Sequence, residues 1–103
     1  MLLVNIDYLP GKNFEVLGMV RGNVVQSKNF GSDFMAAMKT LVGGEIADYT
    51  DLLNEARQIA IKRMVDQAEE LQADAVLNIR YASSSVMQGA AEVIAYGTAV
   101  RFV

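Results

Sequence analysis

The sequence contains no cysteine and no histidine among its 103 residues. Without cysteine the chain forms neither disulfides nor zinc–thiolate sites, and this absence does not indicate a compartment. Without histidine it lacks the most common metal ligand and the most common general acid–base group. A catalytic triad is therefore excluded, and serine paired with lysine is the nucleophile–base combination that remains.

Basic residues are also scarce, because nine Lys and Arg stand against twelve Asp and Glu and the net charge is −3. No run or helix face concentrates the basic residues, so we expect no nucleic-acid partner. No apolar run approaches the ~20 residues that cross a bilayer. The start, MLLVNIDYLPGK, lacks the basic region and the cleavage site of a signal peptide. We therefore expect a cytoplasmic protein with no membrane partner.

Apolar residues make up 52% of the chain and charged residues 20%, with a single proline. This composition predicts one ordered domain over residues 1–103, since domains cluster at about 100–150 residues. A domain of this size buries only about two-thirds of its unfolded surface. The apolar content exceeds what a small monomer needs, and it favours a subunit interface.

Three segments have the composition and alternation of β-strands, namely 14–28, 73–83 and 90–103. The polar segment 84–89 predicts a turn, so the last two strands should pair antiparallel. Strands that are apolar on both faces need cover on both sides, and the edges of so small a sheet need protection. Both requirements again favour a closed oligomer.

Two glycines, Gly18 and Gly22, interrupt the first of these strands. In a two-residue repeat they fall on the same face as Val20 and Val24, together with Phe14 and Val16. Glycine inside a strand marks a bulge or the close approach of another backbone. We prefer this interpretation to a ligand contact.

Two helices are expected between the first and second strands. The first has Ser32 as its N-cap and ends at Gly43, and its Met35 and Met38 are interpreted as core residues and not as a Cu(I) site. The second begins between Glu45 and Tyr49 and continues to about Gln72, a length of roughly 35–40 Å. It spans the whole domain.

The second helix has an unusually wide apolar face. Its polar residues form one narrow arc, and the apolar arc covers about 240°, against about 100° for an ordinary surface helix. One sheet cannot cover such an arc, so a second surface, most simply another subunit, should cover the rest. The apolar arc consists of Leu52, Leu53, Ala56, Ile59, Ala60, Ile61, Met64, Val65, Ala68 and Leu71.

Arg57 and Arg63 fall within this apolar arc. A guanidinium there needs a carboxylate or carbonyl partner, because it does not lose its charge. One interpretation is that its stem packs while its head reaches water. The other is an ordered ion pair at a subunit boundary, with Glu45, Glu55 or Glu92 as the acceptor.

Acidic residues gather at the start of the second helix. Asp48, Asp51 and Glu55 share one helix face near the N-terminus, where the helix dipole and solvation favour negative charge. That explanation suffices, and the functional alternative is a hard-cation site built from Glu45, Asp48, Asp51 and Glu55. Neither a phosphate-binding loop nor a dinucleotide-binding pattern occurs.

Taken together, the residues predict an α+β fold with a small antiparallel sheet in the order strand–helix–helix–strand–strand. The long helix packs on this sheet, a short extended arm precedes Pro10, and the subunits assemble into a closed homo-oligomer.

Four segments carry a resemblance to a known family. The chain resembles the YbjQ-like family, to which heavy-metal binding has been ascribed, and the resemblance covers nearly the whole chain. It implies an α+β ring, typically a homopentamer, and leaves the function unassigned. A metal in this chain would have to use carboxylates, methionine or backbone oxygens. The matching segments are GMVRG at 18–22, GGEIADYTDLLNEARQIAIKRM at 43–64, ADAVLNIRY at 73–81 and EVIAYGTAV at 92–100.

The first functional hypothesis is a homo-oligomeric binding or scaffold protein with no catalytic residue, holding a small ligand or a divalent metal ion. In it, Tyr49, Arg57, Arg63 and Glu92 form a packing and ion-pair set where subunits meet. The alternative is an enzyme with a site shared between subunits. Glu45 or Glu92 would then be the acid–base, Arg57 the anion anchor and Tyr49 a hydrogen-bond partner.

Overall fold

The computed structural model describes residues 1–27, 47–87 and 90–103. It has the predicted α+β class, with one helix and four strands in the described residues. The helix expected from Ser32 to Gly43 lies outside them. The elements in chain order are β1 (Leu2–Leu3), β2 (Phe14–Ser27), α2 (Ala47–Glu70), β3 (Ala75–Met87) and β4 (Ala90–Phe102).

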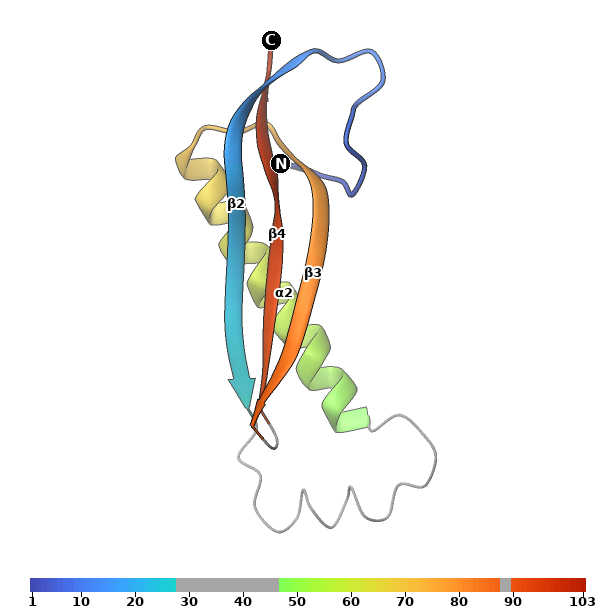
Figure 1. The fold of residues 1–103 in the computed structure, drawn as a ribbon, viewed down its shortest axis with the longest axis vertical. Helices are drawn as coiled ribbons and strands as arrows, with labels where there is room; N and C mark the ends of the chain where they lie inside the picture. Colours follow the sequence, from blue (N-terminus) through green and yellow to red (C-terminus); the bar gives the residue numbers. More distant parts are fainter. Residues whose placement is uncertain (28–46, 88–89) are drawn as a thin grey trace.

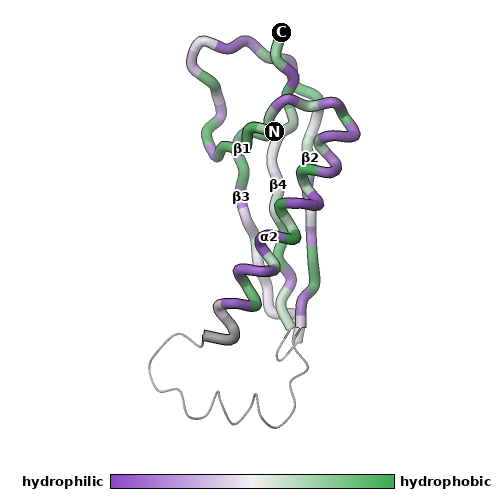
Figure 2. The backbone as a smooth tube through the Cα atoms, turned by 180° about the vertical axis from the view of Figure 1, so that it is seen from behind, coloured by the Kyte–Doolittle hydropathy of each residue, from purple (hydrophilic) through white to green (hydrophobic). Residues whose placement is uncertain are grey.

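The four strands form one sheet in the order β1-β3-β4-β2 (Figures 1 and 2). β4 is central and pairs antiparallel with both β2 and β3, as predicted for the last two strands. β1 pairs parallel with β3, with Leu2 opposite Ala75. The sheet is therefore mixed, and the prediction of a wholly antiparallel sheet was wrong. The reason is that the arm before Pro10 donates backbone hydrogen bonds to β3, including Val4 N to Val76 O at 3.1 Å.

β3 is longer than its sequence pattern suggests. Residues 84–87 were predicted to belong to a polar turn, but they continue the strand, with Ser84 opposite Glu92 and Ser85 opposite Ala91. The backbone pairing with β4 continues through these serines because their side chains do not interrupt the ladder. Strand formation here follows tertiary pairing and not intrinsic propensity.

A β-bulge in β2 changes which side chains face the helix. The register shifts between Val16 and Gly18, and Gly18 has a φ of 140°. Val16 therefore lies on the face opposite Val20 and is 66% exposed. The prediction that Phe14 and Val16 share the face of Val20 was wrong, because a bulge reverses the alternation. The interpretation of the glycines as backbone features is confirmed.

Helix α2 confirms the predicted long helix and crosses β2 and β4 (Figures 1 and 2). Mostly small side chains, spaced four residues apart, form its buried stripe, so its backbone comes close to the sheet. A Cβ added to Gly22 would collide with Ala60 O and Met64 N. The buried helix residues are Leu52, Ala56, Ala60, Met64 and Ala68. The last four pack with Val20, Val24, Val76, Val93, Ala95 and Ala99.

The fold is elongated. Its Cα radius of gyration is 17.2 Å and its longest extent is 55 Å, whereas a compact domain of this length has a radius of gyration of about 13 Å. The helix contacts β2 and β4 extensively and β3 only slightly. Part of the helix-side face of β3 is thus left without cover, and a cavity lies beside it.

Candidate functional site

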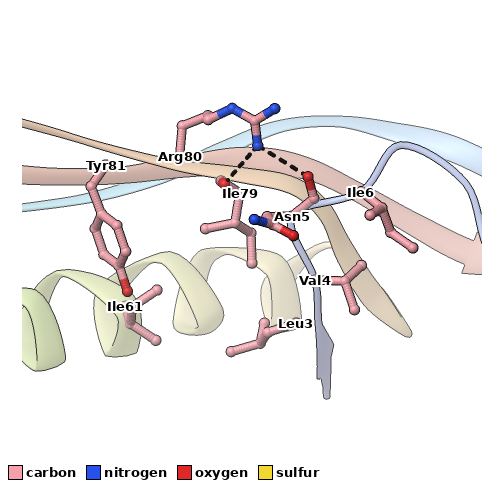
Figure 3. A pocket seen from close by; sticks show the side chains of 8 residues that line it. All are labelled: Leu3, Val4, Asn5, Ile6, Ile61, Ile79, Arg80 and Tyr81. Carbon is pink, nitrogen blue, oxygen red and sulfur yellow. Dashed lines mark hydrogen bonds between the residues drawn. The ribbon is translucent and has the colours of Figure 1, made fainter.

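A cavity of about 870 Å³ lies where β1, β3 and α2 meet (Figure 3). It forms because α2 covers β2 and β4 and leaves this side of β3 uncovered, while the N-terminal arm runs along the β3 edge. Sequence reasoning did not find it. Its lining residues are Leu3, Val4, Asn5, Ile6, Ile61, Ile79, Arg80 and Tyr81.

A bulge in β3 shapes this cavity. The register of β3 against β4 shifts between Leu77 and Arg80, and Asn78 has a φ of 57°. Asparagine is one of the few residues that tolerate this left-handed conformation. Asn78 N then donates to Ile6 O at 2.9 Å and Ile79 N to Val4 O at 3.1 Å. The bulge therefore joins β3 to the arm.

The side chain of Arg80 also binds the N-terminal arm, from the sheet face away from α2. Its Nη1 donates to Asn5 O at 3.0 Å and to Ile79 O at 3.1 Å. In Figure 3 the guanidinium lies over these two carbonyls, while Ile61 and Tyr81 lie on the side of the helix. Arg80 therefore lies on the opposite side of β3 from Ile79, Ile61 and Tyr81, and it holds the arm at the edge of the sheet.

Arg63 and Gln67 of α2 complete the hydrogen bonds of edge strand β2. Arg63 Nη1 donates to Asn23 O at 2.7 Å, and Gln67 Oε1 accepts from Arg21 N at 2.7 Å. An edge strand presents unpaired backbone groups, and here side chains from the helix satisfy two of them. The partner of Arg63 is therefore a carbonyl within its own chain, which is one of the two partner types expected.

The remaining residues of the predicted packing set do not meet within one chain. Arg57 Nη1 donates to Asn54 Oδ1 at 2.9 Å on the same helix. Glu92 lies opposite Val25 and Ser84, on the face of the sheet away from α2. The side chain of Tyr49 lies outside the described residues. A site that combined Arg57 with Glu92 would need more than one copy of the chain.

The four predicted metal-binding carboxylates are only partly described. Asp51 and Glu55 are exposed on α2, whereas Glu45 and the side chain of Asp48 lie outside the described residues. Within the described ranges, no group of three His, Cys, Asp or Glu is placed to hold a metal ion. Soft heavy metals prefer thiolate and imidazole ligands, and the sequence has neither. The donors that the sequence leaves for a heavy metal are carboxylates, methionine thioethers and backbone oxygens.

A second, smaller cavity of about 400 Å³ lies beside β2, where Met19 and Arg21 approach Gln67 and Tyr96.

Among the residues that the structure describes, no helix is long and apolar enough to cross a membrane.

Comparison with known proteins places the whole chain in one group. A YbjQ family model described as "Putative heavy-metal-binding" matches residues 1–103. The chain is 58% identical to a UPF0145 protein of Clostridium novyi over 98% of both chains. It is 57% identical to a UPF0145 protein of Alkaliphilus metalliredigens over 100% of both. The UPF0145 protein of Thermosipho africanus is 62% identical, with 98% of this chain and 94% of that protein covered.

A solved structure shares the fold. It is a protein of unknown function from Pediococcus pentosaceus, assigned to the DUF74 family. The two structures align with a TM-score of 0.65 at 17% identity, over 100% of this chain and 98% of the other.

Proposed function

The chain belongs to the YbjQ family, and we propose that it is a cytoplasmic homo-oligomer that binds a ligand or serves as a scaffold without catalysing a reaction. We further propose that the assembly is a pentameric ring. The observation that carries this proposal is the apolar surface that one chain leaves uncovered on the sheet face away from α2.

That surface is extensive. Met19 is 79% exposed, Val16 66% and Val25 58%, all on the same face of β2. Tyr96 and Ile94 of β4 lie opposite Arg21 and Asn23 on this face, beside these side chains. Monomeric proteins seldom expose contiguous apolar patches of this kind, and such patches mark interaction sites. We define the open-face patch as Val16, Met19, Val25, Ile94 and Tyr96.

The helix provides a second apolar surface, which is partly exposed. Leu53, Ile59, Ile61 and Val65 flank the buried stripe of α2 and are only partly buried. Two different apolar surfaces on one chain suit a head-to-tail contact, which closes into a ring when the rotation permits. In this proposal Tyr49, Arg57, Arg63 and Glu92 lie where neighbouring copies meet.

Native mass spectrometry of the untagged protein, purified without added metal, tests the assembly. We expect a pentamer as the main species at micromolar concentration. A monomer at tens of micromolar would overturn the proposal. A ring of another subunit number would overturn the pentamer alone.

The proposed ligand of the ring is a hard cation held by Glu45, Asp48, Asp51 and Glu55, since hard cations prefer oxygen ligands. Calorimetric titration with Ca²⁺ and Mg²⁺ tests this part. We expect saturable heat that is lost in the D51N/E55Q double variant. If millimolar cation produces no heat, the carboxylate site is discarded while the assembly proposal stands.

A further inference from the structure

We propose that the cavity between β1, β3 and α2 is the docking site for a second copy of the chain, whose β4 places Ile94 over the cavity and Glu92 against Arg57. This inference rests on the proposed function, because it requires a homo-oligomer, and it names the two surfaces that meet. The contact is head-to-tail, since the two surfaces are different parts of the chain.

The cavity lacks one wall within a single chain. The helix covers β2 and β4 and only slightly contacts β3. In Figure 3, Ile61, Ile79 and Tyr81 lie in the gap between α2 and β3, and Tyr81 is 52% exposed. The one charged lining residue, Arg80, lies on the opposite side of β3. The side of the cavity that faces α2 is therefore suited to an apolar cover.

A basic residue stands beside the cavity on α2. Arg57 is one turn before Ile61 on the same side of the helix, because residues four positions apart lie next to each other on a helix surface. Arg57 is exposed, and it donates a hydrogen bond to Asn54 on the same helix. Within the described ranges, Arg57 forms no ion pair. Its guanidinium can therefore bind a carboxylate from another chain.

The sheet face away from α2 carries the complementary charge. Glu92 lies on this face, opposite Val25 on one neighbouring strand and Ser84 on the other. It is half-buried, and among the residues that the structure describes it has no ion-pair partner. Removing a charge from water is costly unless the charge is paired. A basic side chain from a second copy would supply the missing partner.

The spacing of the apolar and charged residues agrees between the two surfaces. Arg57 and Ile61 are about 6 Å apart along the helix axis. Glu92 and Ile94 are about 6.6 Å apart along β4, and both lie on the face away from α2. Placing Ile94 over Ile61 therefore brings Glu92 to Arg57, and Tyr96 continues over the cavity.

Charge reversal tests the ion pair, since neutralising an exposed pair changes little. We expect R57E and E92R each to raise the subunit dissociation constant about tenfold, because like charges then face each other. Sedimentation velocity measures this change. The double variant R57E/E92R forms the pair with its charges exchanged, so its dissociation constant should return close to the wild-type value. The controls K62E and E69R reverse charges at exposed positions of α2 outside the apolar arc and should assemble like the wild type.

Cross-linking locates the contact independently. The sequence has no cysteine, so the thiols of an R57C/E92C variant are the only ones present. Position 57 is on α2 and position 92 is on the opposite face of the sheet, so the two thiols do not meet within one chain. With a short bis-maleimide we expect a ladder of covalent oligomers up to the full ring. R57C and E92C alone are the controls and should give no ladder.

Three outcomes would overturn the inference. They are cross-linked products that stop at the dimer, an assembled R57C/E92C protein that gives no cross-link, and folded R57E and E92R proteins that assemble like the wild type. Native mass spectra of the wild type separate the two proposals. A ring combined with any of these outcomes removes only this inference, whereas a monomer removes the proposed function as well. A ring that retains a small molecule and gives no cross-link would assign the cavity to that molecule.

Discussion

The backbone of α2 at Ala60 lies directly against Gly22 of β2, so closely that a Cβ on Gly22 would collide with the carbonyl oxygen of Ala60. The same Cβ would lie 2.8 Å from the Cβ of Arg63. This contact sets the distance between the helix and β2 at one point along the helix. It also explains why the helix stripe consists mostly of alanine at this level.

We predict that Gly22→Ala lowers the free energy of unfolding by roughly 1–3 kcal/mol, because the added methyl group must push the helix away from β2. Urea denaturation measures the loss. The control is Asn23→Ala, which removes an exposed neighbouring side chain and keeps the carbonyl that Arg63 binds. It should change stability by no more than about 0.5 kcal/mol. Equal stability of Gly22→Ala and the wild type would contradict the close contact.

The main elements were predictable because their patterns are long. The apolar spacing of α2 extends over many turns, and β2 and β4 are both long and rich in apolar residues. In these segments, local propensity and burial favour the same secondary structure. Their bounds accordingly agree with the sequence pattern to within a few residues.

The features that sequence analysis missed are set by distant partners. Leu2 and Leu3 contain no signal for parallel pairing with β3, because that pairing joins residues more than seventy positions apart. Val16 changes face through a bulge that a simple alternation does not contain. The cavity depends on both kinds of feature, since the arm and the bulge at Asn78 form its walls. The motif ADAVLNIRY includes Asn78 and Arg80, but only the backbone conformation shows why they matter.

Asn78 gives a second prediction, because its φ of 57° lies in the left-handed region. Asn78→Ala should lower the free energy of unfolding by about 1 kcal/mol. The left-handed conformation crowds the Cβ atom, and alanine has no polar side chain whose local hydrogen bond offsets this cost. Asn78→Gly should be nearly neutral, because glycine adopts this conformation readily. Thermal unfolding of both variants measures the difference. If glycine destabilises as much as alanine, the side chain of Asn78 and not its backbone conformation is what matters.

Arg63 gives a third prediction, which separates its role within the chain from a role between chains. Arg63→Gln should lower stability by about 0.5–1 kcal/mol, because it removes the 2.7 Å hydrogen bond to Asn23 O. Arg57→Gln is the matched control, since the hydrogen bond of Arg57 to Asn54 lies within one exposed turn of the same helix. It should be within about 0.5 kcal/mol of the wild type. Denaturant titration gives both values, and sedimentation of the same samples shows whether either arginine affects assembly.

The open-face patch gives the last prediction. A lysine at position 19 would place a charge in the centre of a surface that we propose is covered by a second copy, and burying an unpaired charge is costly. Met19→Lys should therefore raise the subunit dissociation constant at least tenfold, a change of about 1.4 kcal/mol. Its effect on the fold of one chain should be small, because Met19 is 79% exposed.

Sedimentation velocity over a concentration series measures this shift, and circular dichroism checks that Met19→Lys stays folded. Gln58→Lys is the control, since it adds the same charge to an exposed position of α2 outside the apolar arc. If Met19→Lys and Gln58→Lys assemble as well as the wild type, the open-face patch is not a subunit interface. The exposed valines and methionine of β2 would then have to be explained by a different partner.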